Sequence, residues 1–392
     1  MGVATMDLSF TPEQGAWRRE VRDFLDRELP SKYEFQTDYE ERDEYWDFAV
    51  QFTKKVGARG WIGLTWPKEV GGQARPPIDS AIMVDEFDYR AAPLVNAIGH
   101  GLAGGTILKF GSPEQKRRFI PGILQTETIW VEGLTEPNAG SDLASLETRA
   151  VRDGDDWLIN GQKTFTTWGH RGDVMYLAAR TNPHAPKHKG ITIFCLDMKQ
   201  RGVTLQPLFN LGGGRQNHVF FDNVRVPGDM VIGEEDHGWY CIMNSFYGRG
   251  GGSMGGRVRR MFDKMVKFCQ ETQRNGRPLS KDPVVRMQLT ELALTVECMK
   301  LLGWEGLSRA EHGGPEEFGG SMASVISKDS SPRFAQTCME ILGPLGQLQG
   351  GPWAPLAGEV DKFYRQSFGN HAGGTPQIKR VVAATRGLGL PR

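Results

Sequence analysis

Two short motifs in the middle of the chain carry side chains that could hold a ligand. Residues 134–142 read LTEPNAGSD, and residues 160–167 read NGQKTFTT. Together they supply hydroxyl groups, an aromatic ring and, at turns formed by glycine and proline, backbone N–H groups that can approach a bound molecule closely. These are the groups that hold a flavin ring and its phosphates. The alternative is two ordinary turns of a β domain.

The composition narrows the class of protein. At 392 residues the chain is too long for one small core, so two or three domains are expected. Hydrophobic residues make up 39% and charged residues 24%, which is typical of a soluble globular protein. The 47 basic residues balance the 47 acidic residues, so no global field favours nucleic acid or an anionic membrane.

Cysteine usage and hydropathy indicate the compartment. The five cysteines are widely scattered, a pattern that fits neither a zinc site nor a disulfide framework. The first ten residues lack a basic-then-apolar signal pattern, and no apolar run approaches the ~18 residues of a membrane span. We therefore expect a cytoplasmic protein without a bound metal and without a membrane segment.

The elements that must position the two motifs follow a helical, then β, then helical order. Thr11-Pro12 begins a helix that runs to about Leu29, and Ser112-Pro113 repeats the same capping device. Further helices are expected over 40–59, 78–90, 94–110 and 113–124. From 129 to 232, short β-branched and aromatic runs alternate with turns, which predicts a β-barrel or sandwich. Helices return over 239–274, 284–312, 319–343 and 371–386.

This order predicts an α+β multidomain fold. The expected boundaries are 1–127 for a helical domain, 128–236 for a β domain and 237–392 for a helical bundle. No internal repeat or long linker interrupts the chain.

The motifs resemble the signature of the acyl-CoA dehydrogenase family. Three further stretches match it in the right order, namely 110–119 (FGSPEQKRRF), 224–227 (VRVP) and 373–380 (GGTPQIKR). The resemblance covers nearly the whole chain and implies a helical domain, a middle β domain and a C-terminal four-helix bundle. It also implies bound FAD and oxidation of an acyl-CoA thioester. In that reaction a carboxylate removes the α-proton, and the β-carbon gives a hydride to the flavin.

The resemblance assigns flavin contacts to the first motif. Thr135 and Ser141 should hydrogen-bond the pyrimidine edge or the pyrophosphate of the flavin, with help from the backbone at Leu134 and Gly140.

Further contacts are assigned to the second motif and to the C-terminal stretch. Phe165 stands where the family usually has tryptophan, and the Thr167 hydroxyl stands where the family contacts flavin N5. The alternatives are a core phenylalanine and an ordinary strand threonine. Thr375 and Gln377 lie where the terminal motif of the family meets the flavin.

The adenine half of the flavin is usually gripped by a neighbouring subunit in this family. The matching stretches begin at Arg274 and Glu340 and include Gly343. The Arg274 guanidinium suits a phosphate, although an exposed helix-end arginine is the alternative. The family's aromatic at Asn275 and its glutamines at Pro283 and Glu340 are missing, which puts the adenine contacts in doubt.

The usual catalytic base is also missing. The family places its glutamate either just before the Gly-Thr of the terminal motif or just before a helix arginine, and these positions are Gly373 and Gly248 here. Loss of a general base typically costs ~10²–10⁴ in rate. Arg249 stands where that helix arginine lies close to the thioester, although an intrahelical salt bridge would also explain it.

Glycines dominate the stretch around Arg249. Residues 247–256 contain six of them where relatives are helical. This composition indicates either a break in the helix or space for a bulky, ring-bearing or branched acyl group, and close helix packing is the ordinary alternative.

Three hypotheses remain open. The first is a dehydrogenase with a relocated base, for which Glu132, His371 and His100 are candidates. The second is a non-catalytic or half-site subunit of a hetero-oligomer, and the third is a flavin monooxygenase on the same fold. The resemblance implies a dimer or tetramer, homo- or hetero-oligomeric, with an electron-transfer flavoprotein as the acceptor. A flavin kept only for stability in a binding module is the non-enzymatic alternative.

Overall fold

The computed structural model describes residues 10–34, 39–247, 255–311, 316–369 and 371–391. It consists of two compact units. The first unit combines Met1–Phe35, Arg75–Ala92 and Gly250–Arg392, and the second combines Gln36–Ala74 with Pro93–Arg249. The second unit therefore contains both ligand motifs, and the first unit contains the C-terminal motif.

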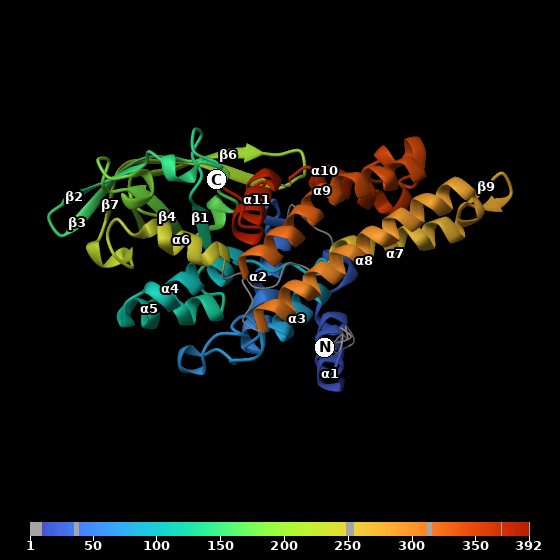
Figure 1. Ribbon diagram of the computed structural model, residues 1–392, viewed down its shortest axis with the longest axis horizontal. Coiled ribbons are helices and arrows are strands. Elements are labelled where there is room, and N and C mark those ends of the chain that lie inside the picture. Colours follow the sequence, from blue (N-terminus) through green and yellow to red (C-terminus); the bar gives the residue numbers. More distant parts are fainter. Residues whose placement is uncertain (1–9, 35–38, 248–254, 312–315, 370, 392) are drawn as a thin grey trace. The chain divides into compact units, whose positions relative to one another are not determined.

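An eight-stranded mixed sheet forms the centre of the second unit (Figure 1). Its strands run in the order β6-β7-β3-β2-β4-β5-β8, and β1 pairs with β4 in parallel. The strands are β1 (Trp130–Gly133), β2 (Arg149–Asp153), β3 (Asp156–Lys163), β4 (Val174–Arg180), β5 (Ile191–Asp197), β6 (Val203–Phe209), β7 (Arg215–Val226) and β8 (Val231–Ile232).

Both faces of the sheet are buried at its centre. Tyr176 and Cys195 belong to a core that the sheet shares with helices of this unit, whereas Met175 and Leu177 belong to the core on the opposite face. Because side chains alternate along a strand, β4 is buried along nearly its whole length. The helices of this unit are α2 (Asp43–Ala58), the π-helix η4 (Gly99–Ala103), α4 (Gly104–Phe110), α5 (Pro113–Leu124) and α6 (Gly238–Tyr247).

In its described residues, the first unit is helical apart from one short hairpin. In it α9 packs against α8, α10 and α11, while α3 packs against α1 and α7. Figure 1 shows α8 and α9 running side by side. The elements are α1 (Pro12–Glu28), α3 (Pro77–Arg90), α7 (Gly256–Glu271), β9 (Gln273–Arg274), β10 (Arg277–Pro278), α8 (Pro283–Glu311), α9 (Glu316–Leu342), α10 (Glu359–Ser367), α11 (Pro376–Val382) and the π-helix η12 (Ala383–Gly387).

The structure confirms the predicted α+β class and many of the elements that local sequence signals predicted. Thr11 and Ser112 both form complete capping boxes, each with a proline at the start of the helix. Asp153 pairs with Asp156 across a two-residue turn that contains Gly154 at φ 64°.

Two predicted helices were wrong in extent. The helix predicted over 239–274 is divided, because Gly255 adopts φ 84° and α7 begins only at Gly256. The last helix begins at Pro376 rather than at residue 371. The domain boundaries at 127/128 and 236/237 stay predictions. No helix among the described residues is long and apolar enough to cross a membrane.

Candidate functional site

The two ligand motifs are joined by hydrogen bonds within the second unit. The Thr164 amide donates to the Thr135 carbonyl at 2.9 Å, and the Lys163 ammonium donates to the Leu134 carbonyl at 3.1 Å. The end of β3 and the loop after β1 therefore form one surface. The Leu134 carbonyl therefore already accepts one hydrogen bond from inside the protein.

The predicted ligand-binding groups reach solvent at this surface. Gly140, Ser141 and Thr167 are exposed, and Thr135 is half-buried. Phe165 is 50% exposed and has φ 59°, so it is not a core residue. A ring beside three hydroxyls can stack on a heteroaromatic ligand while the hydroxyls bond its polar edge.

The same surface passes two tests of fit for a flavin. A Cβ added at Gly140 would meet no atom within 4 Å, so the backbone there faces open space. The Thr167 hydroxyl accepts a hydrogen bond from Gln216 at 3.3 Å, which leaves its own O–H able to donate. The residues present therefore fit a flavin at this surface.

A buried ion pair under this surface was missed by the sequence analysis. Lys163 is completely buried, and its Nζ lies 2.6 Å from Oε1 of Glu136, which is 6% exposed. Burial lowers the pKa of Lys163 to about 8. Burial opposes ionisation of Glu136, yet the charge of Lys163 and its hydrogen bond bring the pKa of Glu136 below its ordinary value. The only sequence signal was a charged residue inside each motif.

Glu132 lies on β1, immediately before the first motif. Its register partner on β4 is the buried Tyr176, and its side chain is half-buried. The Glu132 carbonyl accepts a hydrogen bond from the Thr166 hydroxyl at 3.1 Å. This contact places the Glu132 backbone beside Thr166, which lies between Phe165 and Thr167.

The residues assigned to the adenine half lie together in the first unit. Arg274 is exposed on β9, and its Nη2 donates to the Ile341 carbonyl at 3.3 Å. The Glu340 carboxylate accepts hydrogen bonds from one glutamine of α8 and one of α9. Gly343 follows α9 with φ 64°. These positions bring Arg274 next to the end of α9.

The C-terminal motif forms the start of α11. Thr375 is the N-cap of this helix, its hydroxyl accepting the Ile378 amide at 3.2 Å, and Gln377 is exposed. His371 is exposed in the preceding turn. Gly373 has φ 69°, and a Cβ there would meet no atom within 4 Å.

Two predicted positions, Gly248 and Arg249, lie outside the described residues. Among the neighbouring glycines, Gly256 has a clear structural reason, because a Cβ there would come within 2.3 Å of the Asp85 carbonyl oxygen on α3. Close helix packing therefore explains Gly256, and Gly255 supplies the left-handed turn that starts α7.

His100 lies on the π-helix η4, and its Nε2 is buried with no hydrogen-bond partner among the described residues. Burial lowers the pKa of His100 to about 4. The ring is therefore neutral at pH 7 and a weak proton acceptor, which disfavours His100 as the base.

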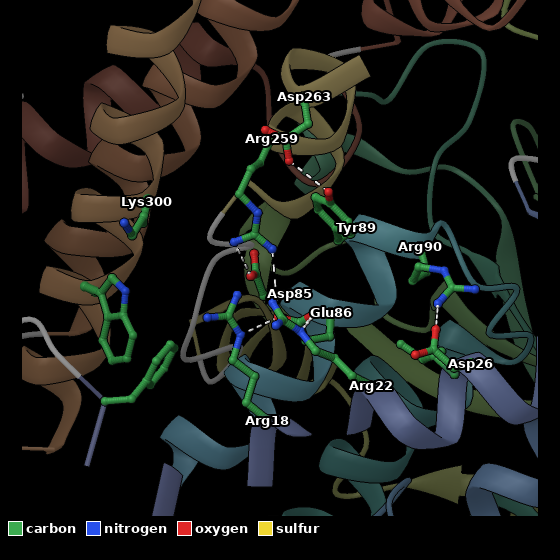
Figure 2. Close-up of a pocket in the computed structure, with 13 residues that line it drawn as sticks. Arg18, Arg22, Asp26, Asp85, Glu86, Tyr89, Arg90, Arg259, Asp263 and Lys300 are labelled. Carbon is green, nitrogen blue, oxygen red and sulfur yellow. Dashed lines mark hydrogen bonds and ion pairs between the residues drawn. The ribbon is translucent and has the colours of Figure 1, made fainter. Parts of the chain in front are cut away.

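A pocket of about 550 Å³ lies in the first unit, between α1, α3, α7 and α8, and contains none of the predicted site residues (Figure 2). Arg18 and Arg22 both donate to the buried Glu86, and Arg259 lies 2.9 Å from Asp85. Its lining residues are Phe10, Arg18, Arg22, Leu25, Asp26, Asp85, Glu86, Tyr89, Arg90, Arg259, Asp263, Lys300 and Trp304.

The charges in this pocket serve mainly to join helices. Burial would raise the pKa of Glu86, but hydrogen bonds from Arg22 and Arg18 bring that pKa below its ordinary value. Because Glu86 lies on α3 and both arginines lie on α1, this network fixes α1 against α3. No cluster of side chains among the described residues could hold a metal ion.

One class of flavin-dependent oxidoreductases combines a helical N-terminal region, a mixed β-sheet with a surface that fits a flavin, and a helical C-terminal region. This chain has the same three parts. The comparisons with known proteins agree. The sequence matches the N-terminal domain of acyl-CoA dehydrogenase over residues 11–127, the middle domain over 132–224 and the C-terminal domain over 236–388. The chain belongs to the acyl-CoA dehydrogenase family and is an enzyme of this type.

Relatives with full-length similarity include the acyl-CoA dehydrogenase FadE26 of Mycobacterium tuberculosis, which is 33% identical over 99% of each chain. Among solved structures, the Tcur3481-Tcur3483 steroid ACAD is 32% identical, with a TM-score of 0.90 over 99% of this chain and 100% of that chain. The ChsE4-ChsE5 complex from Mycobacterium tuberculosis is 31% identical, with the same TM-score and coverage. The names of these two solved relatives each join two components, and the second is called a complex.

Proposed function

We propose that this chain is one subunit of an FAD-dependent acyl-CoA dehydrogenase made of two different polypeptides, whose partner supplies the carboxylate that removes the α-proton. One observation carries the proposal. The family's two base positions are glycine here, Gly248 and Gly373, although the hydroxyls of Thr135, Ser141 and Thr167 are kept. Glycine has no side chain to accept a proton, so a chain that retains the cofactor surface needs a base from elsewhere.

The second unit would hold the isoalloxazine of FAD through this surface. Phe165 would stack near the ring, and the hydroxyls of Thr135, Ser141 and Thr167 would bond its polar edge. When bound, FAD accepts the hydride from the β-carbon of the thioester. Arg274 would hold a phosphate of an FAD that is shared between subunits.

The substrate is proposed to be a CoA thioester with a bulky, ring-bearing acyl group. Support comes from the solved steroid ACAD, which resembles this chain over its whole length. A panel that compares a steroid side-chain CoA thioester with a straight-chain thioester tests this assignment. Faster flavin reduction by the straight-chain thioester would refute it. An electron-transfer flavoprotein is the proposed acceptor, tested by its reduction in the same assay.

The experiment compares the purified chain with the chain co-purified with a related polypeptide that has a glutamate at a family base position. Each sample is mixed anaerobically with the thioester, and loss of the yellow flavin colour is followed. We expect bleaching only in the co-purified pair. Loss of bleaching when the partner's glutamate is replaced by glutamine would identify that glutamate as the base. Full bleaching by the chain alone would refute the two-chain proposal.

A relocated base at Glu132 is the second candidate. It is supported by the hydrogen bond that places the Glu132 backbone beside the second motif. Under this hypothesis the chain alone bleaches its flavin, and Glu132→Gln abolishes the bleaching. If the glutamine variant bleaches at the unaltered rate, Glu132 is eliminated.

A further inference from the structure

We infer that the buried ion pair between Lys163 and Glu136 positions the loop 134–148 for flavin binding. This inference rests on the proposed FAD site. It concerns two positioning residues and not catalytic ones, because the Lys163 side chain is 0% exposed and the Glu136 side chain is 7% exposed. Neither charged group can touch a ligand at the surface.

Lys163 fixes the beginning of the loop. It is the last residue of β3, and its Nζ donates to the Leu134 carbonyl at 3.1 Å and to Glu136 Oε1 at 2.6 Å. One ammonium group therefore holds two loop residues on either side of Thr135. The next residue along the chain, Thr164, binds the Thr135 carbonyl through its amide at 2.9 Å. The orientation of the Thr135 hydroxyl depends on these three bonds.

Glu136 fixes the end of the loop. Its carboxylate accepts the Glu147 amide at 2.6 Å and the Thr148 amide at 2.9 Å. Its own backbone exchanges two hydrogen bonds of 3.1 Å with Ala139, which close the turn that leads to Ser141. One side chain thus connects the start of the loop to the residues that enter β2. Charge-assisted bonds of this kind are stronger than neutral ones.

General stabilisation is a weaker explanation for the pair. Burying two charges costs desolvation energy, and an apolar pair of similar volume is often as stable or more stable. What an apolar pair cannot supply is directional bonding to the Leu134 carbonyl and to the Glu147 and Thr148 amides. The geometry therefore points to loop positioning, with Ser141 and Thr135 as the groups positioned.

The test is a double variant, Glu136→Leu with Lys163→Met, made in the full chain. FAD is removed and then titrated back while flavin fluorescence is followed, and the thermal midpoint of the FAD-free protein is measured separately. We expect a thermal midpoint near that of the unaltered chain and an FAD dissociation constant raised at least tenfold. The visible spectrum of the FAD-saturated variant should also shift, because the hydroxyls are displaced.

Lys187→Met is the matched control. Lys187 lies outside the loop but forms a 2.8 Å ion pair with Asp142, which belongs to it. The Lys187 side chain is 63% exposed. Exposed pairs contribute little, so FAD affinity should stay within threefold of the unaltered chain. If the double variant also stays within threefold, the inference is overturned while the FAD site stands. If the unaltered chain binds no FAD even when it is co-purified with its partner subunit, the proposed function and the inference both fail.

Hydrogen exchange on the unaltered, FAD-free chain provides a second test that needs no variant. The amides of Glu147 and Thr148 should exchange as slowly as those of the sheet core, because the Glu136 carboxylate binds both. Exchange as fast as that of an exposed loop would overturn the inference, even if the double variant failed to fold.

Discussion

Gly373→Glu should restore a base to this chain. The structure leaves room for the new side chain, because a Cβ at residue 373 would meet no atom within 4 Å. The backbone conformation disfavours the substitution, since φ of residue 373 is 69° and a non-glycine residue in this left-handed region costs roughly 1–2 kcal/mol. For a chain of 392 residues that cost lowers the thermal midpoint by a few degrees or less.

The expected gain in rate is larger than this cost. A positioned general base contributes ~10²–10⁴, which corresponds to about 3–5 kcal/mol of activation free energy. Because the strained backbone will not orient the glutamate ideally, we expect about a hundredfold faster flavin reduction, at the lower end of that range.

The assay is anaerobic flavin bleaching by the acyl-CoA substrate, with FAD bound at equal occupancy in every sample. Gly373→Gln is the control, since it has the same backbone strain and nearly the same shape but cannot accept the proton. Both variants are measured alone and with a partner subunit whose own base has been neutralised. If the glutamate variant reduces its flavin no faster than the glutamine variant, residue 373 does not face the substrate α-carbon and the reasoning is refuted.

Three further predictions follow from buried groups in the two units. In a urea titration, Glu86→Gln should lower the free energy of unfolding by about 3 kcal/mol, because it leaves two arginines without their buried partner. As the control, Asp26→Asn at a 70% exposed carboxylate should change that free energy by less than about 1 kcal/mol. Below pH 6.5 the unfolded chain protonates His100, whereas in the folded chain this histidine has a pKa of about 4 and stays neutral. Lowering the pH from 7 to 5 should therefore reduce the free energy of unfolding by about 2 kcal/mol. If His100→Gln has the same dependence of stability on pH as the unaltered chain, the prediction is contradicted. Gly256→Ala should destabilise by about 1–3 kcal/mol, since its Cβ would lie 2.3 Å from a carbonyl oxygen, whereas Gly306→Ala in α8, where a Cβ would meet nothing, should be neutral or stabilising in thermal melts.

The sequence predicted those parts of the fold that depend on neighbouring residues. The capping boxes at Thr11 and Ser112 and the turn at Gly154 are local, since each is specified within a few positions. The glycines around Arg249 raised a break in the helix as one alternative, but the start of α7 was not predicted, because it depends on the left-handed Gly255 and on how closely Gly256 approaches α3, a contact between residues far apart in the chain. The π-helix that carries His100 was missed for a similar reason, because no local pattern distinguishes it from an α-helix.

The candidate site shows the same limit. The motifs predicted which hydroxyls and which ring belong to the surface, and they placed Thr135 and Phe165 on neighbouring segments. They did not predict that Lys163 reaches across 27 positions of the chain to Glu136, since period and turn signals carry no information on such pairs. The base could not be located from the sequence either, because it depends on which side chain approaches the substrate in space.

The acids of the first motif strengthen the argument for a base from outside this motif. A general base works best when its pKa lies near the operating pH. The charge of Lys163 brings the pKa of Glu136 below its ordinary value against the effect of burial, and a hydrogen bond from Lys187 lowers the pKa of Asp142. Both acids therefore have less affinity for a proton than an ordinary carboxylate, and Glu136 is in addition a buried acceptor that positions the loop. Because neither acid of the first motif suits the role of base, the proton acceptor must come from another segment or from another subunit.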